Sequence, residues 1–403
     1  MNAGQLNLVS GKMIPLEYPS FIKYMGSKSK IMDFVVEGIN EVHRGGVVCD
    51  LFSGSASLAG ALGQQCAVHS NDIQSYSAVL ADVYSRAFRS SGFPTADQIL
   101  NDAEKVVTVH GIPWALDIDY SSLNTLSTFN KVENQQKKLI KHTFSNDWHL
   151  FAKNYSGTWW SYTQCAWIDA IREVAERYKN TAAYNPILAS LMFAMAYASQ
   201  GTGHYAQYRD AKTKSSLKDI SIYRRRSIAS YFRRKFEELP VWLPETEPVL
   251  PHKSTSLDYV ECLKSLEGGT VYADPPYCFV HYSRFYHAIE TLVRYDYPEL
   301  QEKKGKVVKG RYRDDRHQSP FCIKTKVSKA FQDLFQGVAD SGANLAMSYS
   351  NTGMISIEEV QSLASDYFAN RRVEVLLTDH QHMTLGRLKD RHRDVQECLL
   401  LVK

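Results

Sequence analysis

The stretch that decides the fold is Val271-Tyr272-Ala273-Asp274-Pro275-Pro276-Tyr277. Its apolar start, bounded by turn residues, predicts a short buried strand over residues 270–273. The two prolines end this strand, because proline has no N–H group to donate to a neighbouring strand. We therefore expect Asp274 at the carboxyl end of a strand, the edge where open α/β sheets bind their ligands. The alternative at this point is an ordinary strand-to-turn junction, in which Asp and Pro are common.

The tetrapeptide that begins at Asp274 suits a substrate with an exocyclic amine on an aromatic ring. The lone pair of such an amine is delocalised into the ring, so the nitrogen is a poor nucleophile. The Asp274 carboxylate and a backbone carbonyl aimed by Pro275, whose φ is fixed, would accept the two N–H bonds and localise the lone pair. The ring of Tyr277 would stack on a base that has been extruded from its helix.

A second informative stretch lies near the start of the chain. Residues 47–51 form an apolar run that predicts a strand, and Phe52-Ser53-Gly54-Ser55-Ala56-Ser57 follows it, ahead of an apolar helix expected over 58–62. Strand, small-residue turn and helix are the parts of a nucleotide-binding unit, in which small residues let a ligand approach the backbone. The turn is not the Gly-x-Gly-x-x-Gly fingerprint of dinucleotide sites.

Asp72 follows a second predicted strand, over residues 67–70, and lies 22 residues after Asp50. Nucleotide sites of the Rossmann type place the acid that binds the ribose hydroxyls at about this interval, roughly 20 residues. The alternative is a helix N-cap, because residues 73–84 have a helical pattern.

Residues 21–30, FIKYMGSKSK, precede a periodic segment at 31–39. Glycine and small polar residues between lysines at a helix start make an anion-binding site, with Tyr24, Gly26 and Lys28 as the candidates. The alternative is a lysine-rich helix start on the surface.

Taken in order, these motifs resemble those of the DNA adenine methylase family. The resemblance implies S-adenosylmethionine as the cofactor and assigns catalysis to the tetrapeptide of residues 274–277, whose Asp form usually accompanies methylation of adenine N6. It further implies that Lys28 lies near the cofactor carboxylate and that Ala56 replaces the second glycine of the family's Asp-Leu-Phe-x-Gly-x-Gly motif. The remaining residues that the resemblance assigns to cofactor binding are Tyr24, Gly26, Asp50, Phe52, Ser53, Gly54, Asp72 and Asp258. For Asp258 the alternative is an N-cap of a short helix over 259–266.

The middle of the chain differs in character from both ends. Residues 85–250 are rich in tryptophan and have helical periodicity, including a buried helix expected over 187–197 and one helix over 220–236 with outward-facing arginines. Arg209, which follows a polar loop at 199–204, is a candidate for contact with nucleic acid. In the resembling family this region carries target recognition. The alternative is a solvated amphipathic surface.

The strongest basic cluster follows the catalytic motif, at residues 303–316. Its glycine-punctuated pattern predicts a mobile loop that grips a phosphate backbone through Lys306, Lys309 and Arg311. The alternative is a solvated charged surface.

We therefore predict an α/β fold, a Rossmann-like mixed-sheet methyltransferase with an inserted, mainly helical recognition domain. Residues 1–90 and 251–403 would form the methyltransferase domain, and 91–250 the insertion. The second part would include a basic loop at 278–320 and three final strands, at 344–349, 372–378 and 395–402, of which the last two form an antiparallel pair.

Composition narrows the class of protein further. A net charge of +4 is too small to indicate nucleic-acid binding by itself, so that prediction rests on local clusters. The seven cysteines have no Cys-x-x-Cys spacing, and His380, His382 and His392 lack partner ligands, so we expect reduced thiols, surface histidines and no metal. The start of the chain lacks a signal-like core and no stretch is long enough to span a membrane, which predicts a cytoplasmic location.

The predicted function is site-specific methylation of adenine N6 in double-stranded DNA, in a restriction-modification or phage-type system with a possible cognate restriction endonuclease. Cytosine-N4 methylation uses the same geometry and remains open. Methylation of RNA or of protein glutamine is less favoured, because those relatives carry Asn at the first motif position. A DNA-binding subunit without catalysis is the alternative from another class.

Overall fold

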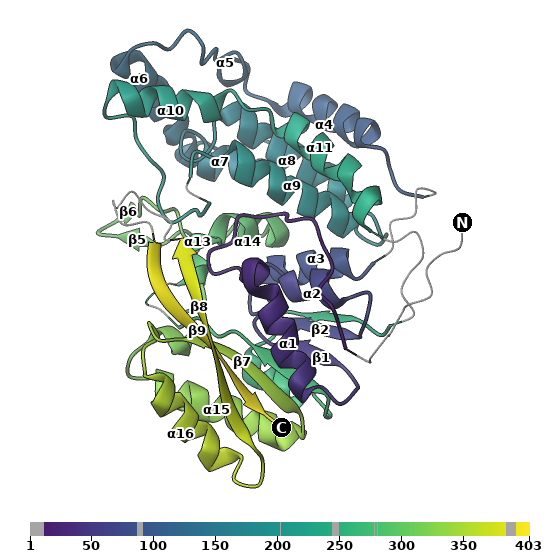
Figure 1. Cartoon of the computed structure of the whole chain (residues 1–403). Helices are drawn as coiled ribbons and strands as arrows, with labels where there is room; N and C mark the ends of the chain where they lie inside the picture. Colours follow the sequence, from purple (N-terminus) through teal and green to yellow (C-terminus); the bar gives the residue numbers. More distant parts are fainter. Residues whose placement is uncertain are drawn as a thin grey trace.

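The computed structural model describes residues 12–86, 92–201, 203–243, 250–277, 279, 281–383 and 392–403. Among these residues, seven strands form one sheet in the order β3-β2-β1-β4-β7-β9-β8 (Figure 1). In that order the strands span Lys253–Thr255, Val68–Asn71, Val48–Asp50, Thr270–Ala273, Asn344–Ser350, His392–Val402 and Val373–Met383. Parts of three predicted loops lie outside the described residues, namely Thr202, Cys278 and Val280, and 384–391.

The sheet is mainly parallel. β1 pairs in parallel with β2 and β4, and β4 with β7, whereas β9 runs antiparallel to both β7 and β8. Every residue of β1, β2 and β4 is buried, as expected for parallel strands that helices cover on both faces. The strands predicted at 47–51, 67–70 and 270–273 are confirmed to within one residue, and the final antiparallel pair is confirmed but longer than predicted.

Two hydrophobic clusters lie on opposite faces of this sheet, because successive side chains of a strand point to opposite faces. In β4, Tyr272 belongs to one cluster and Val271 to the other. The first face is covered by α1 (Met32–Val42), α3 (Ser75–Tyr84) and α14 (His287–Arg294), with α2 (Ser57–Leu62) beside them. The second face is covered by α12 (Tyr259–Lys264), α15 (Val327–Ser341) and α16 (Ile357–Tyr367).

A helical segment connects α3 to β3, and Figure 1 shows it gathered on one side of the sheet, at the top of the view. Its helices are α4 (Ala96–His110), α5 (Pro113–Leu116), α6 (Leu126–Lys137), α7 (Leu150–Tyr155), α8 (Tyr162–Glu176), α9 (Tyr184–Ala198), α10 (Lys214–Arg224) and α11 (Ile228–Trp242), with a 3-10 turn η2 (Lys138–Lys141). The helical character expected for this region is therefore observed, and the helix expected at 187–197 lies within the apolar, almost wholly buried α9.

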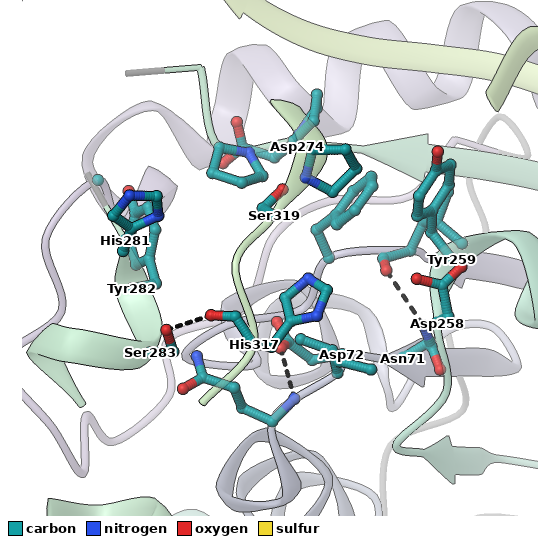
Figure 2. Close-up of a pocket in the computed structure, with 18 of the residues that line it drawn as sticks. Asn71, Asp72, Asp258, Tyr259, Asp274, His281, Tyr282, Ser283, His317 and Ser319 are labelled. Carbon is teal, nitrogen blue, oxygen red and sulfur yellow. Dashed lines mark hydrogen bonds between the residues drawn. The ribbon is translucent and has the colours of Figure 1, made fainter. Parts of the chain in front are cut away.

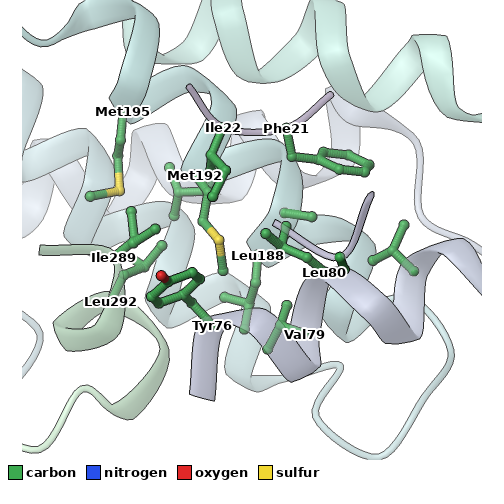
Figure 3. Close-up of a cluster of buried hydrophobic side chains, with 14 of the residues drawn as sticks. Phe21, Ile22, Tyr76, Val79, Leu80, Leu188, Met192, Met195, Ile289 and Leu292 are labelled. Atoms are coloured by element: carbon green, nitrogen blue, oxygen red, sulfur yellow. The ribbon is translucent and has the colours of Figure 1, made fainter. Parts of the chain in front are cut away.

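α9 joins the helical segment to the sheet. Leu188 and Met192 of α9 lie in one cluster with Leu80 of α3 and Ile289 of α14 (Figure 3). Because these side chains are fully buried, burial of apolar surface holds the segment against the helices that cover the first face of the sheet.

The single helix predicted over 220–236 is wrong. α10 ends at Arg224 and α11 begins at Ile228, where the Ser227 side chain accepts a hydrogen bond from the Ser230 N–H group as an N-cap. Arg224 is buried, contrary to the outward-facing arginines that we expected, and it donates to both carboxylate oxygens of Glu133. A buried ion pair and a local cap thus override a continuous helical pattern.

The predicted basic loop contains a small hairpin of β5 (Glu302–Lys303) and β6 (Lys306–Val307). Lys304 and Gly305 form its turn with φ values of 53° and 68°, the two positive values that a tight hairpin of this kind requires. The remaining short elements are η1 (Lys28–Ile31), α13 (Tyr282–Phe285) and η3 (Pro320–Cys322). Among the described residues, no helix has the length and apolar content to cross a membrane.

Candidate functional site

A pocket of about 880 Å³, open mouth included, lies at the carboxyl edge of the parallel strands. Figure 2 shows Asp72, Asp258 and Asp274 around it. Each of these acids follows within a few residues of the end of β2, β3 or β4, so the sheet order places them side by side. This is the edge at which the sequence predicted the ligand site.

The turn after β1 lines the pocket through Phe52, and its next residues line a smaller cavity beside it. The Ser53 N–H group donates to the Asn71 carbonyl at 2.8 Å, and the Gly54 N–H group donates to Asp72 Oδ2 at 3.0 Å. A Cβ atom on Gly54 would lie 2.8 Å from the Tyr24 hydroxyl oxygen, and its φ of 50° would strain a residue with a side chain. The structure therefore brings the predicted residues Phe52, Ser53 and Gly54 together with Asp72.

Ala56 takes the place of the glycine in the resembling motif, and it keeps the conformation that a glycine would adopt. Its φ of 58° and ψ of 31° are left-handed, at the N-cap of α2. Such a conformation costs a residue with a side chain about 1–2 kcal/mol. The turn therefore has a glycine-like shape despite the substitution.

Asp72 lies two residues before Gln74, the N-cap of α3, so the alternative N-cap is not at Asp72 itself. Its Oδ1 accepts from the Gln74 N–H group at 2.9 Å, which supports the start of α3, and its Oδ2 holds Gly54. A carboxylate accepts about four hydrogen bonds, so capacity remains for a ligand in the pocket that Asp72 lines. Burial raises the pKa of Asp72 to about 6, although the two backbone N–H groups oppose this rise.

The segment at 21–30 lies beside the same pocket. The ring of Tyr24 stacks on those of Tyr282 and Tyr286, with centroids 5.5 and 4.7 Å away. Gly26 has a φ of 77°, and a Cβ atom there would lie 2.8 Å from the Tyr282 hydroxyl oxygen. Both predicted residues therefore line the pocket, in contact with the tyrosine-rich segment that follows the catalytic motif.

Lys28 lies beside the Asp-Pro-Pro-Tyr motif. Its Nζ lies 3.3 Å from Asp274 Oδ1 and 3.1 Å from Glu397 Oε2, and only 6% of the side chain is exposed. Burial alone would lower the pKa of Lys28, but Asp274 and Glu397 together hold it above its usual value. Lys28 thus belongs to the surroundings of the catalytic motif, and Glu397 joins the site although the sequence did not indicate it.

Asp50 ends β1 behind the turn. With Lys28 and Asp274 it lines a smaller cavity of about 350 Å³ next to the main pocket. Burial, followed by the charges of Asp274 and Asp72, raises the pKa of Asp50 well above its usual range. Three carboxyl groups therefore influence one another across the ends of β1, β2 and β4.

The motif at 274–277 is fixed by contacts on both sides. The Tyr277 hydroxyl donates to Glu397 Oε1 at 3.0 Å, and its ring meets that of Tyr349 edge-on, 5.8 Å away. The Pro276 carbonyl accepts from the thiol of Cys322 at 3.7 Å. Asp274, Pro275, Pro276 and Tyr277 all line the pocket.

Asp258 has the N-cap position that was its alternative, and it faces the pocket. Its side chain accepts from the Val260 N–H group at 2.9 Å as the N-cap of α12, and it lines the pocket. Beside Asp258 and Asp72 lie Leu257 and Ile73, apolar side chains that are each 38% exposed. Exposed apolar groups flanked by carboxylates suit a ligand that has both an aromatic ring and hydroxyl groups.

The residues predicted to contact nucleic acid differ in solvent exposure and in their ion pairs. Lys306 is exposed on the hairpin, whereas Lys309 pairs with Asp210 at 2.5 Å and is 41% exposed. Arg311 is 7% exposed and donates to the Asn154 carbonyl, so it is not placed to meet a phosphate. Arg209 pairs with Asp219 and keeps 27% of its side chain exposed.

Sequence reasoning missed the second half of the pocket wall. These residues follow the catalytic motif in the chain, and they are His281, Tyr282, Ser283, His317, Ser319 and Pro320. The Ser283 hydroxyl donates to the His317 carbonyl and ties the two stretches together. The tyrosine- and histidine-rich composition at 281–287 was a signal, but nothing in it located the partner stretch.

A group of soft ligands lies elsewhere in the core. Cys49, His69 and Cys262 place ligand atoms within 4.8 Å of one another, and all three are buried. Zn²⁺ prefers such ligands. Here, however, the two thiol sulfurs lie 3.9 Å from each other and His69 Nε2 lies 2.9 Å from the Thr255 hydroxyl, so each has a protein partner.

The fold and the site together define an α/β protein in which a nucleotide-type turn after β1 and an Asp-Pro-Pro-Tyr motif line adjoining cavities. Residues 24–111 match the family model of D12 class N6 adenine-specific DNA methyltransferases. This match, with the relatives below, confirms the resemblance to the DNA adenine methylase family that the motifs predicted.

Three relatives match most of the chain. The modification methylase LlaI of Lactococcus lactis subsp. lactis is 22% identical over 391 residues, which cover 95% of this chain and 55% of that protein. The type II methyltransferase M.FokI of Planomicrobium okeanokoites is 23% identical, over 86% of this chain and 47% of that protein. The modification methylase StsI of Streptococcus sanguinis is 20% identical, over 88% and 48%. The chain thus spans about half the length of these relatives.

Proposed function

We propose that this chain transfers a methyl group from S-adenosylmethionine to N6 of an adenine in double-stranded DNA. The observation that carries the proposal is that Asp274, at the end of β4, lines one pocket with Phe52 and Asp72, and lines an adjoining smaller cavity with the turn at 52–54. Cofactor motif and catalytic motif are more than 200 residues apart in the chain, and the sheet order β2-β1-β4 brings them together.

The pocket suits S-adenosylmethionine on three counts. Asp72 offers carboxylate oxygens for ribose hydroxyls, Ile73 and Leu257 offer apolar surface for the adenine ring, and Asp258 can accept from the adenine amine. When bound, the cofactor supplies a methyl group on a positively charged sulfur, which keeps the bonding electron pair as the methyl group leaves.

The chain's own residues prepare the target nitrogen. The Asp274 carboxylate and the Pro275 carbonyl accept the two N–H bonds of adenine N6, which directs its lone pair away from the ring and toward the methyl group. As the N–C bond forms, the nitrogen loses a proton, for which the Asp274 carboxylate is the adjacent acceptor. Positioning supplies most of the rate, because a sulfonium methyl group is already activated.

Adenine N6 is paired inside a duplex, so the base must leave the stack, at a cost of a few kcal/mol. The ring of Tyr277, held at its hydroxyl by Glu397 and at its edge by Tyr349, is the surface on which the extruded base would stack. Stacking on an aromatic side chain contributes about 1–3 kcal/mol per base and offsets much of this cost.

We further propose that the helical segment at 96–242 recognises the DNA target and that the hairpin at 302–307 contacts phosphates. Lys303, Lys304 and Lys306 are exposed on this hairpin, and Arg209 remains a candidate for base contact. The relatives are named modification methylases, so we place the chain in a restriction-modification system whose endonuclease reads the same site, without requiring the two proteins to bind each other.

The test is product analysis on the purified protein. S-adenosylmethionine with a deuterated methyl group is incubated with DNA of mixed sequence, and the digested nucleosides are separated by mass spectrometry. Labelled N6-methyladenine supports the proposal. Labelled N4-methylcytosine would instead support cytosine-N4 methylation, and absence of label from every DNA would refute the proposal. Asp274→Ala should abolish the label, whereas Asp340→Ala, an exposed acid on α15, should not.

A further inference from the structure

Glu397 is a buried acid in β9 with two partners from the catalytic site. Its Oε2 lies 3.1 Å from Lys28 Nζ, and its Oε1 accepts from the Tyr277 hydroxyl at 3.0 Å. Only 1% of Glu397 is exposed. A carboxylate buried to this extent costs several kcal/mol unless it is paired, so its place in the core requires these partners.

The antiparallel direction of β9 brings Glu397 to the site. Parallel strands place their last residues at the carboxyl edge, whereas an antiparallel strand places its early residues there. Glu397 lies opposite Ser350, the last residue of β7, and Asp274 follows β4, the other neighbour of β7. One charged group of the site, the Glu397 carboxylate, therefore comes from a strand that carries no recognised motif.

Lys28 links the two acids. Its Nζ lies between Asp274 Oδ1 and Glu397 Oε2, at 3.3 and 3.1 Å, and 5.3 Å from the centroid of the Tyr277 ring. If Lys28 faced Asp274 alone, the two side chains would form a neutral ion pair. The Asp274 carboxylate would then be a weaker acceptor for the N–H groups of a base. With Glu397 present the group of three carries one net negative charge, and the Lys28 ammonium is divided between two carboxylates.

We propose that Glu397 is a positioning residue for methyl transfer, which sets Asp274 through Lys28 and sets the Tyr277 ring through its hydroxyl. This inference rests on the proposed function and adds a residue to it. Removing the charge should therefore slow the chemical step more than it weakens the binding of either ligand.

Two variants separate the two contacts. Glu397→Gln keeps an oxygen for the Tyr277 hydroxyl but removes the charge that Lys28 faces, and Tyr277→Phe keeps the ring but removes the hydroxyl. Glu374→Gln is the matched control, because Glu374 lies on the adjacent strand β8 and pairs with Lys403 at 3.0 Å, outside the pocket. Circular dichroism verifies that each variant is folded.

The measurements are the single-turnover rate of methyl transfer, the affinity for S-adenosylmethionine, and the fluorescence of 2-aminopurine placed at the target base. We expect Glu397→Gln to lower the rate by about 10–100-fold, the size expected when one interaction with a charged group is lost. Cofactor affinity and the rise in fluorescence on base extrusion should stay within about threefold of the wild type. Tyr277→Phe should lose less, about 3–10-fold, because it loses one hydrogen bond and no charge.

The methylation rates and cofactor affinities of the variants decide the inference. If the wild type methylates DNA and Glu397→Gln does so within threefold of Glu374→Gln, the inference is overturned while the proposed function stands. A loss of cofactor affinity with an unchanged rate would also overturn it. If Glu397→Gln does not fold, a Tyr277→Phe rate equal to the wild type overturns the inference, and a reduced rate with intact base extrusion supports it. A wild type without DNA methylation would refute the proposed function, and this inference with it.

Discussion

Replacing Asp72 by asparagine should raise the stability of the protein and weaken its cofactor binding at the same time. Burial raises the pKa of Asp72 to about 6 in the folded state, against an ordinary value of 3.8. The folded protein therefore binds this proton more tightly than the unfolded chain does. The bound proton therefore stabilises the folded protein fully below pH 3.8, and this stabilisation is lost as the pH rises through about 6.

The difference of about two pH units corresponds to about 3 kcal/mol that the ionised Asp72 costs the folded protein at pH 7. Asparagine removes this cost but keeps only one acceptor for the N–H groups of Gly54 and Gln74, which now bond to the two carboxylate oxygens. The lost hydrogen bond is worth about 1–1.5 kcal/mol. Asp72→Asn should therefore be more stable than the wild type by about 1.5–2 kcal/mol at pH 7, and less stable by about 1–1.5 kcal/mol near pH 3.5.

Cofactor affinity should change in the opposite sense. If Asp72 accepts from the ribose hydroxyls, its replacement removes a charged acceptor worth about 1.5–3 kcal/mol, or a 10–150-fold weaker Kd. Urea unfolding between pH 3.5 and 8 and calorimetric titration with S-adenosylmethionine measure the two effects. Asp258→Asn is the control for stability, because Asp and Asn are equivalent as N-caps. A variant less stable than the wild type at pH 7 would refute the electrostatic argument, and unchanged affinity would refute the ribose role.

Further substitutions test other parts of the structure. Asp274→Ala should abolish methyl transfer and leave cofactor affinity within about tenfold, or 1.4 kcal/mol, as turnover and titration of one preparation would show. Arg224→Met should destabilise the fold by about 3–5 kcal/mol in urea unfolding, because it leaves Glu133 buried without its ion pair. Lys306→Gln should weaken binding to every DNA sequence equally and flatten the slope of log affinity against log salt by about 0.9. Arg209→Ala should cost about 1–3 kcal/mol on the cognate site and little on scrambled DNA.

Each of these expectations has a clear contrary result. Retained turnover would remove Asp274 from catalysis, and a stability change below 1 kcal/mol would show that the Glu133 carboxylate is solvated or protonated. Loss of binding only to cognate DNA in the Lys306 variant, or an equal loss on both duplexes in the Arg209 variant, would reverse the assignment of phosphate and base contacts.

The turn after β1 and the position of the Asp-Pro-Pro-Tyr motif could be predicted from the sequence because their signals are local. An apolar run of four or five residues followed by a turn indicates a buried parallel strand wherever it occurs, and β1, β2 and β4 all match this pattern. The position of Asp72 after its strand likewise follows from spacing alone. The order of the strands was not predicted, and the observed order β3-β2-β1-β4-β7 places these acids at one edge.

Other features depend on distant contacts and left no local signal. Arg224 and Glu133 are 91 residues apart, so the helical pattern around Arg224 could not show that it would be buried in an ion pair. Arg311 lies in a basic run whose other members are mostly exposed, yet it donates to the Asn154 carbonyl 157 residues away. The family resemblance placed Lys28 near the cofactor, but the pairing with Asp274 depends on a third residue, Glu397, that only the register of β9 reveals.

The charge balance of the site is consistent with the chemistry that we propose. Among the described residues, Asp50, Asp72, Asp274 and Glu397 converge on the ends of the strands, and Lys28 is the lysine that pairs with two of them. Burial raises the pKa of Asp50 and Asp72, so their ionised forms are costly in the protein alone. A cationic ligand favours ionised neighbours, and S-adenosylmethionine carries a positive sulfur. Part of the cost of gathering these acids would therefore be offset when such a cofactor binds, and binding should release protons near pH 6.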